Sequence, residues 1–531
     1  MILQGVIWAL QTQWMILSTL LVSKLAFKFA TFINGMATGV AGALAGRVAG
    51  KSHQRRIDGV LHWAVGALMV GYVLVAIGYM IHSGYIDHVE PSIAVQGAIF
   101  RHGGDVYPQP GSHTLHGLLY GPGLTELQAL FQASGLPIVM ASKLPGLLAL
   151  FVFCGVMASV LTHRLTRAYV FVMLMPFGIF LLWNRAEPLF LMLVALAIWL
   201  SNAAAVPKLW RAAMLGCLAG LASTLKLHGA MYVFAAVVAS LPATRLDGRH
   251  MLLFAIGAVI PMAASFWPAP ISIHNYFAFV ALAGKHGISA YMAAVNGSYL
   301  ALMLSPMLLL SLKAPSHGRE HSVRIGLVIA VEVCSAIIGA KPGAGIHHLL
   351  PFLPINAYLL QRYFELQPGR SKWGPASLGG ALLGMALLPS AWALFDLGRK
   401  LVNTFDDTSA ARQELAQLST QYPGLVLGIT GSQGYEYYFL RPELEAKGMP
   451  QVDFTAFMDQ NLSGVTDARF LQALQRCTFK YMALPIEGAP FSIANYYTGH
   501  PLLSDDVRQT FAKRYQLKAS GRYLSVYACA L

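Results

Sequence analysis

The chain has 531 residues, of which 56% are hydrophobic and only 11% are charged, and its mean hydropathy is +0.56. This composition excludes an ordinary soluble domain and indicates a polytopic membrane protein. The formal net charge of +14 would suit a nucleic-acid-binding protein, but the basic residues lie mostly between apolar runs, so we predict no nucleic-acid partner.

The first 57 residues form an apolar extension whose topology the sequence leaves open. Two apolar stretches flank Lys24 and Lys28, and the second is rich in glycine and alanine. One span, a hairpin and interfacial helices are all compatible with this pattern. A cleaved signal peptide is disfavoured, because a basic start, a short apolar core and a small-residue cleavage site do not follow one another.

Residues 58–396 are predicted to form a transmembrane helical domain. A helix needs roughly 17–25 apolar residues to cross a bilayer. The run 212–241 is longer than this, is interrupted at 226–229 and has basic residues on both flanks, which favours a hairpin of two helices. About eleven helices are predicted from residue 60 onward, and about 11–13 for the polytopic α-helical chain as a whole. The other spans are predicted at 60–81, 138–162, 167–183, 187–205, 251–268, 298–313, 322–340, 346–361 and 375–396.

Basic residues set the predicted orientation of these helices. Arg47, Lys51, Arg55 and Arg56 precede the first span of the domain, and cytoplasmic loops carry an excess of Lys and Arg. The large polar loop 83–137 after that span therefore faces outward. An odd number of crossings places the C-terminal residues on the same outer side.

From residue 397 to residue 531 the chain is mixed and charged, and it is long enough to bury a core of its own. Short β-like runs at 424–430, 479–484 and 523–528 alternate with helix-like stretches at 407–420 and 464–475. We predict a small extracytoplasmic α/β domain. The turn 428–434 lacks both the P-loop ending and the dinucleotide-binding spacing, so it is interpreted as a structural turn.

Two of the five cysteines, Cys477 and Cys529, fall in this C-terminal domain. An oxidising exterior permits a disulfide between them, and two free thiols are the alternative. No C-x-x-C pair or H-E-x-x-H pattern suggests zinc, so no metal and no other cofactor is predicted. A divalent ion is still compatible with the sequence, because a carboxylate pair beside a phosphate could hold one.

An acidic pair, Asp87 and Glu90, stands directly after the first span, at the start of the outer loop. Ionisable groups held at a membrane surface cost free energy, which favours a functional interpretation. Asp87 could instead cap a helix that starts near Pro91, and Glu90 could be a first-turn acid that suits the dipole of that helix.

Further motifs follow this pair along the chain. Residues 103–108 are similar to a G-x-x-x-Y-P element and residues 119–123 to a Y-G-P-L element, and polar residues stand at external turns at 184–188, 226–228 and 345–351. In their order and common sidedness these motifs resemble the GT-C class of integral-membrane glycosyltransferases, which includes protein O-mannosyltransferases and lipid A aminoarabinose transferases. The resemblance covers about residues 58–396, and the C-terminal domain fits it loosely. The acids depart from the pattern, because they are spaced D-x-x-E instead of adjacent.

The resemblance implies a sugar donor linked to polyprenyl phosphate, a lipid, glycan or protein acceptor, and a multi-pass protein in the inner membrane of a bacterium. The chemistry needs a base for the attacking hydroxyl, for which Asp87 is the candidate with Glu90 beside it, and displacement in one step would invert the anomeric centre. Fixed positive charge must also meet the phosphate. The candidates at the outer rim are Lys226, His228, Arg185, Lys341, His347 and His348, and the candidates for substrate contacts in the loop are Tyr107 and Tyr120.

Each candidate has a structural alternative. Lys226 could extend to water from the end of a span, and Arg185 could form an ion pair with Glu187. The remaining candidates could be polar or aromatic residues that anchor helices at the membrane interface, namely His347, His348, Tyr107, Tyr120 and Trp183.

Two other function classes stay open. A transporter or flippase of lipid-linked sugars often shows repeated halves with broken helices, and the sequence shows no internal repeat. A scaffold that binds a glycan or a partner through its C-terminal domain would tolerate the loss of Asp87, whereas the enzyme would not.

Overall fold

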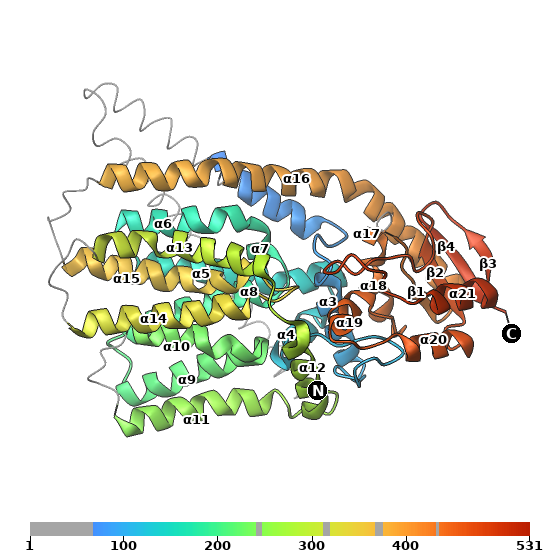
Figure 1. Ribbon diagram of the computed structural model, residues 1–531, viewed down its shortest axis with the longest axis horizontal. Helices are drawn as coiled ribbons and strands as arrows, with labels where there is room; N and C mark the ends of the chain where they lie inside the picture. The colour runs from blue at the N-terminus through green and yellow to red at the C-terminus, as the bar shows by residue number, and fades with distance from the viewer. Residues whose placement is uncertain are drawn as a thin grey trace, which may run out of the picture.

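The computed structural model describes residues 67–68, 70–240, 247–311, 319–366, 375–431 and 435–530. The N-terminal extension 1–57 and part of the turn 428–434 lie outside the described residues. Figure 1 shows a bundle of long helices joined end-on to a smaller domain that contains the four strands. Each half has its own large cluster of buried apolar side chains.

The bundle is built from helices that follow the predicted apolar runs. Tight crossings depend on small residues: a Cβ at Gly216 would stand 2.0 Å from the carbonyl oxygen of Phe254, so only glycine lets these two backbones approach so closely. The bundle helices are Val70–Ile81, α5 (Ile138–Val160), α6 (Arg164–Leu174), α7 (Gly178–Leu182), α8 (Ala186–Asn202), α9 (Lys208–Leu225), α10 (Ala230–Ser240), α11 (Gly248–Ala264), α13 (Ala290–Ser311), α14 (Arg319–Ile338) and α15 (Leu353–Leu366).

Few of these helices are by themselves long and apolar enough to cross a membrane. Among the described residues α5 meets both conditions, and α12 (Ile273–Ala283) with η4 (Gly284–His286) and the first part of α13 meets them only as a pair bent by 94°. Four further apolar helices are shorter. The predicted span 167–183 is divided by η1 (Met175–Phe177), and the predicted span 346–361 begins as the 3₁₀ helix η5 (Ile346–Phe352). The number of membrane crossings therefore stays a prediction.

Short elements gather at the end of the bundle that faces the C-terminal domain (Figure 1). They include α3 (Glu90–Arg101) and α4 (Pro122–Gln132) from the loop 83–137, as well as α12, which the sequence did not predict. The interruption at 226–229 contains η2 (Leu227–Gly229), and α9 and α10 pack against each other on either side of it, as a hairpin requires. Glu90, Lys226 and His228 are among the candidate site residues that lie on or next to these short elements.

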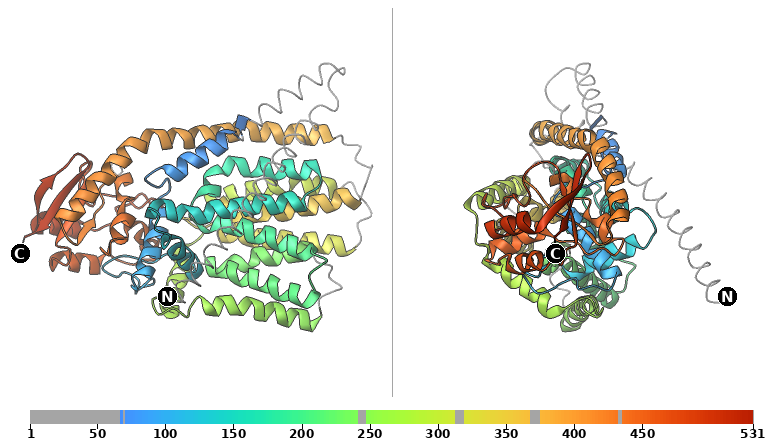
Figure 2. Two further views of the ribbon diagram at one scale, coloured as in Figure 1. Left: turned by 180° about the vertical axis from the view of Figure 1, so that it is seen from behind. Right: turned by 90° about the vertical axis from the view of Figure 1, so that its right-hand side faces the viewer.

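A single helix, α16 (Pro375–Gln421), runs for 47 residues from the bundle into the C-terminal domain. Figure 2 shows it along one edge of both halves. The boundary predicted between residues 396 and 397 therefore falls inside a helix, and the stretch 407–420 is the end of the same helix. The helix contains Pro389 and still continues past the change in composition, and it ends at Gln421, two residues before Pro423.

The C-terminal domain has a four-stranded sheet in the order β1-β2-β4-β3. β1 (Leu425–Leu427) pairs in parallel with β2 (Tyr481–Pro485), whereas β4 (Leu524–Cys529) is antiparallel to β2 and to β3 (Tyr515–Ser520). The three predicted strands match β1, β2 and β4, and β3 was not predicted. The structure joins Cys477 to Cys529 by a disulfide. The helices are α17 (Tyr435–Tyr438), α18 (Arg441–Glu445), α19 (Phe454–Leu462), α20 (Ala468–Gln475) and α21 (Asp505–Arg514).

A buried ion pair holds this domain against the outer loop. Arg441 Nη2 lies 3.0 Å from Asp453 Oδ1 and donates to Ser92 Oγ on α3 at 2.5 Å. Asp453 N also donates to the carbonyl oxygen of Thr114 at 2.8 Å. Both charged side chains are almost completely buried. Both partners of the pair belong to the C-terminal domain, so the contacts with Ser92 and Thr114 are what join the outer loop to it.

His116 lies buried beside this ion pair and makes the docked state sensitive to acid. Burial lowers the pKa of His116 to about 4, against 6.5 ordinarily, and its Nδ1 has no hydrogen-bond partner among the described residues. The unfolded chain then binds a proton that the folded chain excludes. We expect the free energy of unfolding to fall by up to about 3 kcal/mol from this residue as the pH drops from 6.5 to 4.

Comparing wild type with His116→Gln isolates the contribution of His116 to the loss of stability in acid. Thermal unfolding in detergent, measured at pH 7 and pH 4.5, should show a smaller acid-induced loss for His116→Gln than for wild type. His113→Gln serves as the control, because His113 is exposed three residues earlier. Equal losses in wild type and His116→Gln would contradict the prediction.

Candidate active site

Asp87 lies in the short loop between the helix Val70–Ile81 and α3. Its Oδ1 accepts a hydrogen bond from Val89 N at 3.0 Å and lies 3.4 Å from Arg185 Nη1, and its side chain keeps 17% of its surface exposed. Val89, and not Asp87, occupies the N-cap position of α3, which no side chain caps. The alternative interpretation of Asp87 as a helix cap is therefore wrong. The carboxylate is held in place with part of its surface open.

Glu90 is completely buried below this loop. Its Oε2 accepts hydrogen bonds from Ile86 N and Asp87 N, both at 3.0 Å, and its Oε1 contacts Tyr79 Oη and lies 3.3 Å from Asn184 N. Burial is the main cause that raises the pKa of Glu90. Glu90 has no access to a substrate in this arrangement. It fixes the backbone that carries Asp87, so its role is positioning.

This role predicts a specific kinetic effect for Glu90→Gln. A neutral amide replaces two charge-assisted hydrogen bonds with weaker ones, each worth about 1.5–3 kcal/mol when charged. We expect kcat to fall roughly 10- to 100-fold while KM stays within about 3-fold. Kinetics of purified protein check this result, with Glu126→Gln on the neighbouring helix α4 as the control. An unchanged kcat would show that Glu90 does not position the catalytic loop.

Arg185 connects the candidate residues to one another. It stands at the N-cap position of α8, and its guanidinium carbon lies 3.9 Å from the ring centre of Trp183. Nε donates to Tyr120 Oη at 2.7 Å, while Nη1 faces Asp87 and Nη2 donates to His347 Nε2 at 3.4 Å. The ion pair with Glu187, considered as an alternative, is present with a separation of 3.7 Å, but it is one of several contacts.

Lys226 lies at the end of α9 and points into the protein. Its Nζ donates to Glu187 Oε1 at 2.7 Å and sits 4.6 Å from the ring centre of Tyr120. The side chain is only 10% exposed, so it does not extend to bulk water as the alternative proposed. An ammonium group has three N–H donors, and the described residues supply an acceptor for one of them. The remaining donors are available to a ligand.

These two cations line a cavity of about 360 Å³, which we call the basic cavity. His228, His347 and Lys341 also line it, and every phosphate-binding candidate from the sequence is therefore brought to one place. His348 Nδ1 lies 3.2 Å from His228 Nε2. Since His347 and His348 are buried, they are not interfacial anchors.

Asp87 faces a second and larger cavity of about 820 Å³, which we call the wide cavity. Residues of α16 and of the C-terminal domain form much of its lining, including Lys400, Thr404, Thr408 and Asn495. The contact between Asp87 and Arg185 joins this cavity to the basic cavity. A carboxylate and a cluster of cations thus meet at the boundary between two spaces.

The two loop tyrosines have different surroundings. Tyr120 lines the basic cavity and holds Arg185. Tyr107 is fully buried between Tyr276 and Phe279, donates to the carbonyl oxygen of Tyr120 at 2.7 Å and lines neither cavity. The structure therefore supports neither a substrate contact nor an interface anchor for Tyr107, because aromatic side chains of α12 enclose it.

Sequence reasoning missed three residues near this site. Lys143 on α5 is buried and donates to the carbonyl oxygens of Tyr79, His82 and Gly84 at 2.7–3.0 Å, which fixes the start of the Asp87 loop. A lysine inside a predicted apolar span was a usable signal for it. Asp459 and Tyr497 reach the basic cavity from the C-terminal domain. No local pattern marks those two, because the tertiary fold brings them there.

In the described part of the chain, no group of three or more His, Cys, Asp or Glu residues is arranged to hold a metal ion. The histidines of the basic cavity lie against each other and against cations instead. The expectation of no metal stays a prediction.

No protein-family model matches the chain, and no curated protein matches its sequence. Solved structures do match its fold. ArnT from Cupriavidus metallidurans bound to undecaprenyl phosphate matches with a TM-score of 0.52 and 12% identity, and ArnT from the same organism in the apo state matches with a TM-score of 0.52 and 13% identity. Each alignment covers 88% of this chain and 98% of that chain.

The chain has the ArnT fold. The resemblance to the GT-C class is thereby confirmed for the architecture. The match to ArnT covers more of the chain than residues 58–396, so it includes part of the C-terminal domain that was expected to fit loosely. At 12–13% identity the comparison with ArnT shows the fold alone, and the chemistry depends on the residues of this site.

Proposed function

We propose that this protein is a membrane glycosyltransferase that moves a sugar from a polyprenyl-phosphate donor to a lipid, glycan or protein acceptor. One observation carries the proposal: Arg185 contacts Asp87 at 3.4 Å and lines the basic cavity together with Lys226. A base and a phosphate-binding site are thereby adjacent. The bound undecaprenyl phosphate of the fold relative ArnT supports the same class of ligand.

The donor phosphate would lie in the basic cavity. Lys226 offers N–H donors toward it, and Arg185 supplies a second fixed cation within a mostly buried setting. Charge-assisted hydrogen bonds of this kind are about twice as strong as neutral ones. As the sugar leaves, negative charge grows on the phosphate, and preorganised cations stabilise that charge without rearrangement. These cations supply the charge that a metal would otherwise bring, so we propose no cofactor.

The acceptor hydroxyl would approach from the wide cavity. Asp87 takes its proton, the hydroxyl oxygen attacks the anomeric carbon, and the bond from that carbon to the phosphate oxygen breaks. The electron pair of this bond stays on polyprenyl phosphate, which leaves as the product. A single displacement with attack opposite to the leaving group inverts the anomeric configuration.

A multi-pass protein of the bacterial inner membrane, with the C-terminal domain on the outer side, fits this reaction. Lipid-linked sugars are membrane substrates, and both cavities lie between the bundle and the C-terminal domain. The sided distribution of basic residues in the sequence supports the orientation.

Purified full-length protein distinguishes transfer from transport. In detergent with a radiolabelled undecaprenyl-phosphate sugar and a lipid extract as acceptor, we expect undecaprenyl phosphate to be released as the acceptor gains the label. Movement of the intact lipid-linked sugar across liposomes, without cleavage, would instead identify a flippase.

A further inference from the structure

The basic cavity contains a carboxylate that the proposed reaction does not use. Asp459, on α19, is the only acid among the described residues that line this cavity. Its neighbours include Arg185, Lys226 and Lys341, which can only donate hydrogen bonds. An acid opposes the binding of a phosphate, so Asp459 needs a different explanation.

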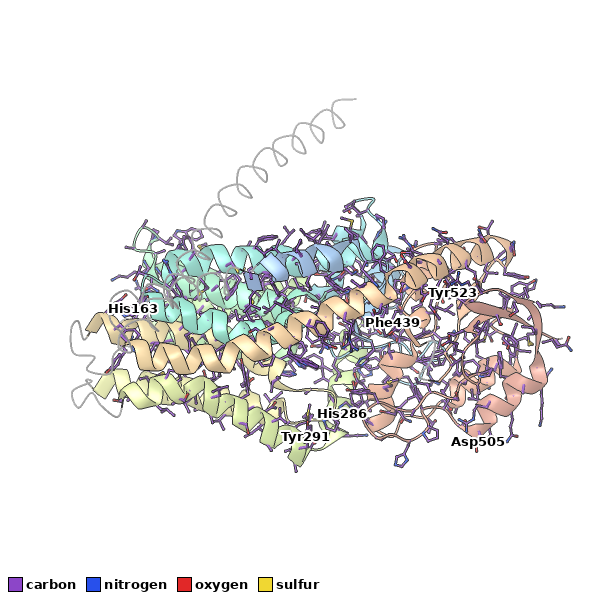
Figure 3. The ribbon with its side chains drawn as sticks, turned by 90° about the horizontal axis from the view of Figure 1, so that it is seen from above. His163, His286, Tyr291, Phe439, Asp505 and Tyr523 are labelled. Carbon is purple, nitrogen blue, oxygen red and sulfur yellow. A yellow bond between two sulfur atoms is a disulfide. The ribbon has the colours of Figure 1, made fainter. Side chains whose placement is uncertain are left out.

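Two hydrogen bonds from side chains to backbone carbonyl oxygens fix the position of α19 against the end of the bundle. The ring Nε2 of His286 lies 2.9 Å from the carbonyl oxygen of Asp459, and Ser463 Oγ donates to the carbonyl oxygen of Leu282 at 2.9 Å. In Figure 3, His286 lies where the bundle meets the C-terminal domain, far from His163 at the other end. The C-terminal domain thus forms one wall of the cavity.

The loop opposite this wall is shaped to accept the carboxylate. Gly343 has a φ of +82°, and a Cβ there would stand 3.3 Å from Asp459 Oδ1 and 3.0 Å from Tyr497 Cζ. A side chain at this position would push against both groups. Glycine therefore lets the two walls close around the space that Asp459 faces.

Tyr497 already gives the Asp459 carboxylate a hydrogen bond, and a carboxylate can accept several more. A sugar next to the phosphate presents several O–H groups, each of which needs an acceptor, and the arginine and lysine side chains of the cavity offer none. Burial raises the pKa of Asp459 to about 6, so the group is still mostly ionised at pH 7. An ionised carboxylate accepts hydrogen bonds strongly and repels a second carboxylate.

We propose that Asp459 is a specificity residue for the donor sugar: it accepts hydrogen bonds from hydroxyl or amino groups of the sugar and excludes sugars that carry a carboxylate. This inference rests on the proposed function, because it places the sugar beside the phosphate in the basic cavity. It assigns the C-terminal domain a direct part in donor selection.

Competition binding to the purified full-length protein tests this role. Labelled undecaprenyl phosphate is bound first, and the concentration needed to displace it is measured for three unlabelled competitors: undecaprenyl phosphate, undecaprenyl phosphoglucose and undecaprenyl phosphoglucuronate. We expect wild type to prefer the glucose form over the glucuronate form by roughly 10-fold or more, as a charged hydrogen-bond partner implies. Asp459→Asn should reduce this ratio to within about 3-fold while binding undecaprenyl phosphate at least as tightly.

The controls separate the two proposals. Asp467→Asn changes an acid of the same domain outside the cavity, where it accepts from Ser504 N at 2.7 Å, and should keep the wild-type ratio. A wild-type ratio in Asp459→Asn would overturn the specificity role alone. If labelled undecaprenyl phosphate binds equally well to wild type and Lys226→Ala, the proposed function fails. Asp459→Ser is a second test of the same ratio, and misfolding of both variants would make Asp459 a structural residue and overturn the inference.

Discussion

Asp87→Asn is expected to abolish sugar transfer while the protein still binds polyprenyl phosphate. The amide keeps the size of the side chain but cannot take a proton from the acceptor, and a general base contributes about 100- to 10,000-fold to such reactions. The Oδ1 atom of the asparagine can still accept the hydrogen bond from Val89 N that holds Asp87 in the wild type. Glycan mass spectrometry on cells that lack the gene, complemented with wild type or with the variant, measures the loss.

Equal expression in the membrane must be shown for both proteins in this experiment. Asp467→Asn is a suitable control, because it replaces a carboxylate of the C-terminal domain that lines neither cavity. If Asp87→Asn restores the glycan fully, Asp87 is not the base. A transporter or a scaffold is then the favoured interpretation.

Lys226→Ala is expected to weaken the binding of undecaprenyl phosphate roughly 10- to 100-fold, because a charge-assisted hydrogen bond of about 1.5–3 kcal/mol is lost. The substitution also leaves Glu187, which is only 2% exposed, without its closest cation. Equilibrium binding of labelled undecaprenyl phosphate to purified protein measures the effect. Lys400→Ala, in the wide cavity, should leave this affinity unchanged.

A paired variant separates phosphate binding from stability. Lys226→Met combined with Glu187→Gln removes both charges of the buried pair, and Arg185, which also lies 3.7 Å from Glu187, keeps Asp87 as a partner. We expect thermal unfolding close to that of wild type, and weak phosphate binding as in the single variant. Recovery of phosphate binding in the pair would show that Lys226 acts only by neutralising Glu187.

Local sequence patterns predicted much of the bundle and several residues of the site. Apolar runs located α5, α8 and α14, because each of these helices must bury or cover a long apolar surface. The basic residues of the cavity could be predicted as a group, since each stands beside a break between apolar runs. The fold match to ArnT agrees with the class that the motif order suggested.

The positions that depend on tertiary contacts could not be predicted in this way. The sequence placed Glu90 beside Asp87 in the candidate site, but burial makes Glu90 a support for the loop. Tyr107 belongs to a sequence motif and yet is enclosed by aromatic side chains of α12, an element that no strong sequence pattern predicts. Asp459 lies far along the chain from the other cavity residues, so only the docked domain reveals it.

A structure of the full-length protein with undecaprenyl phosphate tests the central claim most directly. The account predicts that the phosphate lies in the basic cavity, about 3 Å from Lys226 Nζ and from the guanidinium of Arg185, on the opposite side of that guanidinium from the wide cavity. A phosphate bound beside Lys400 in the wide cavity, or outside both cavities, would contradict the assignment of donor and acceptor sides.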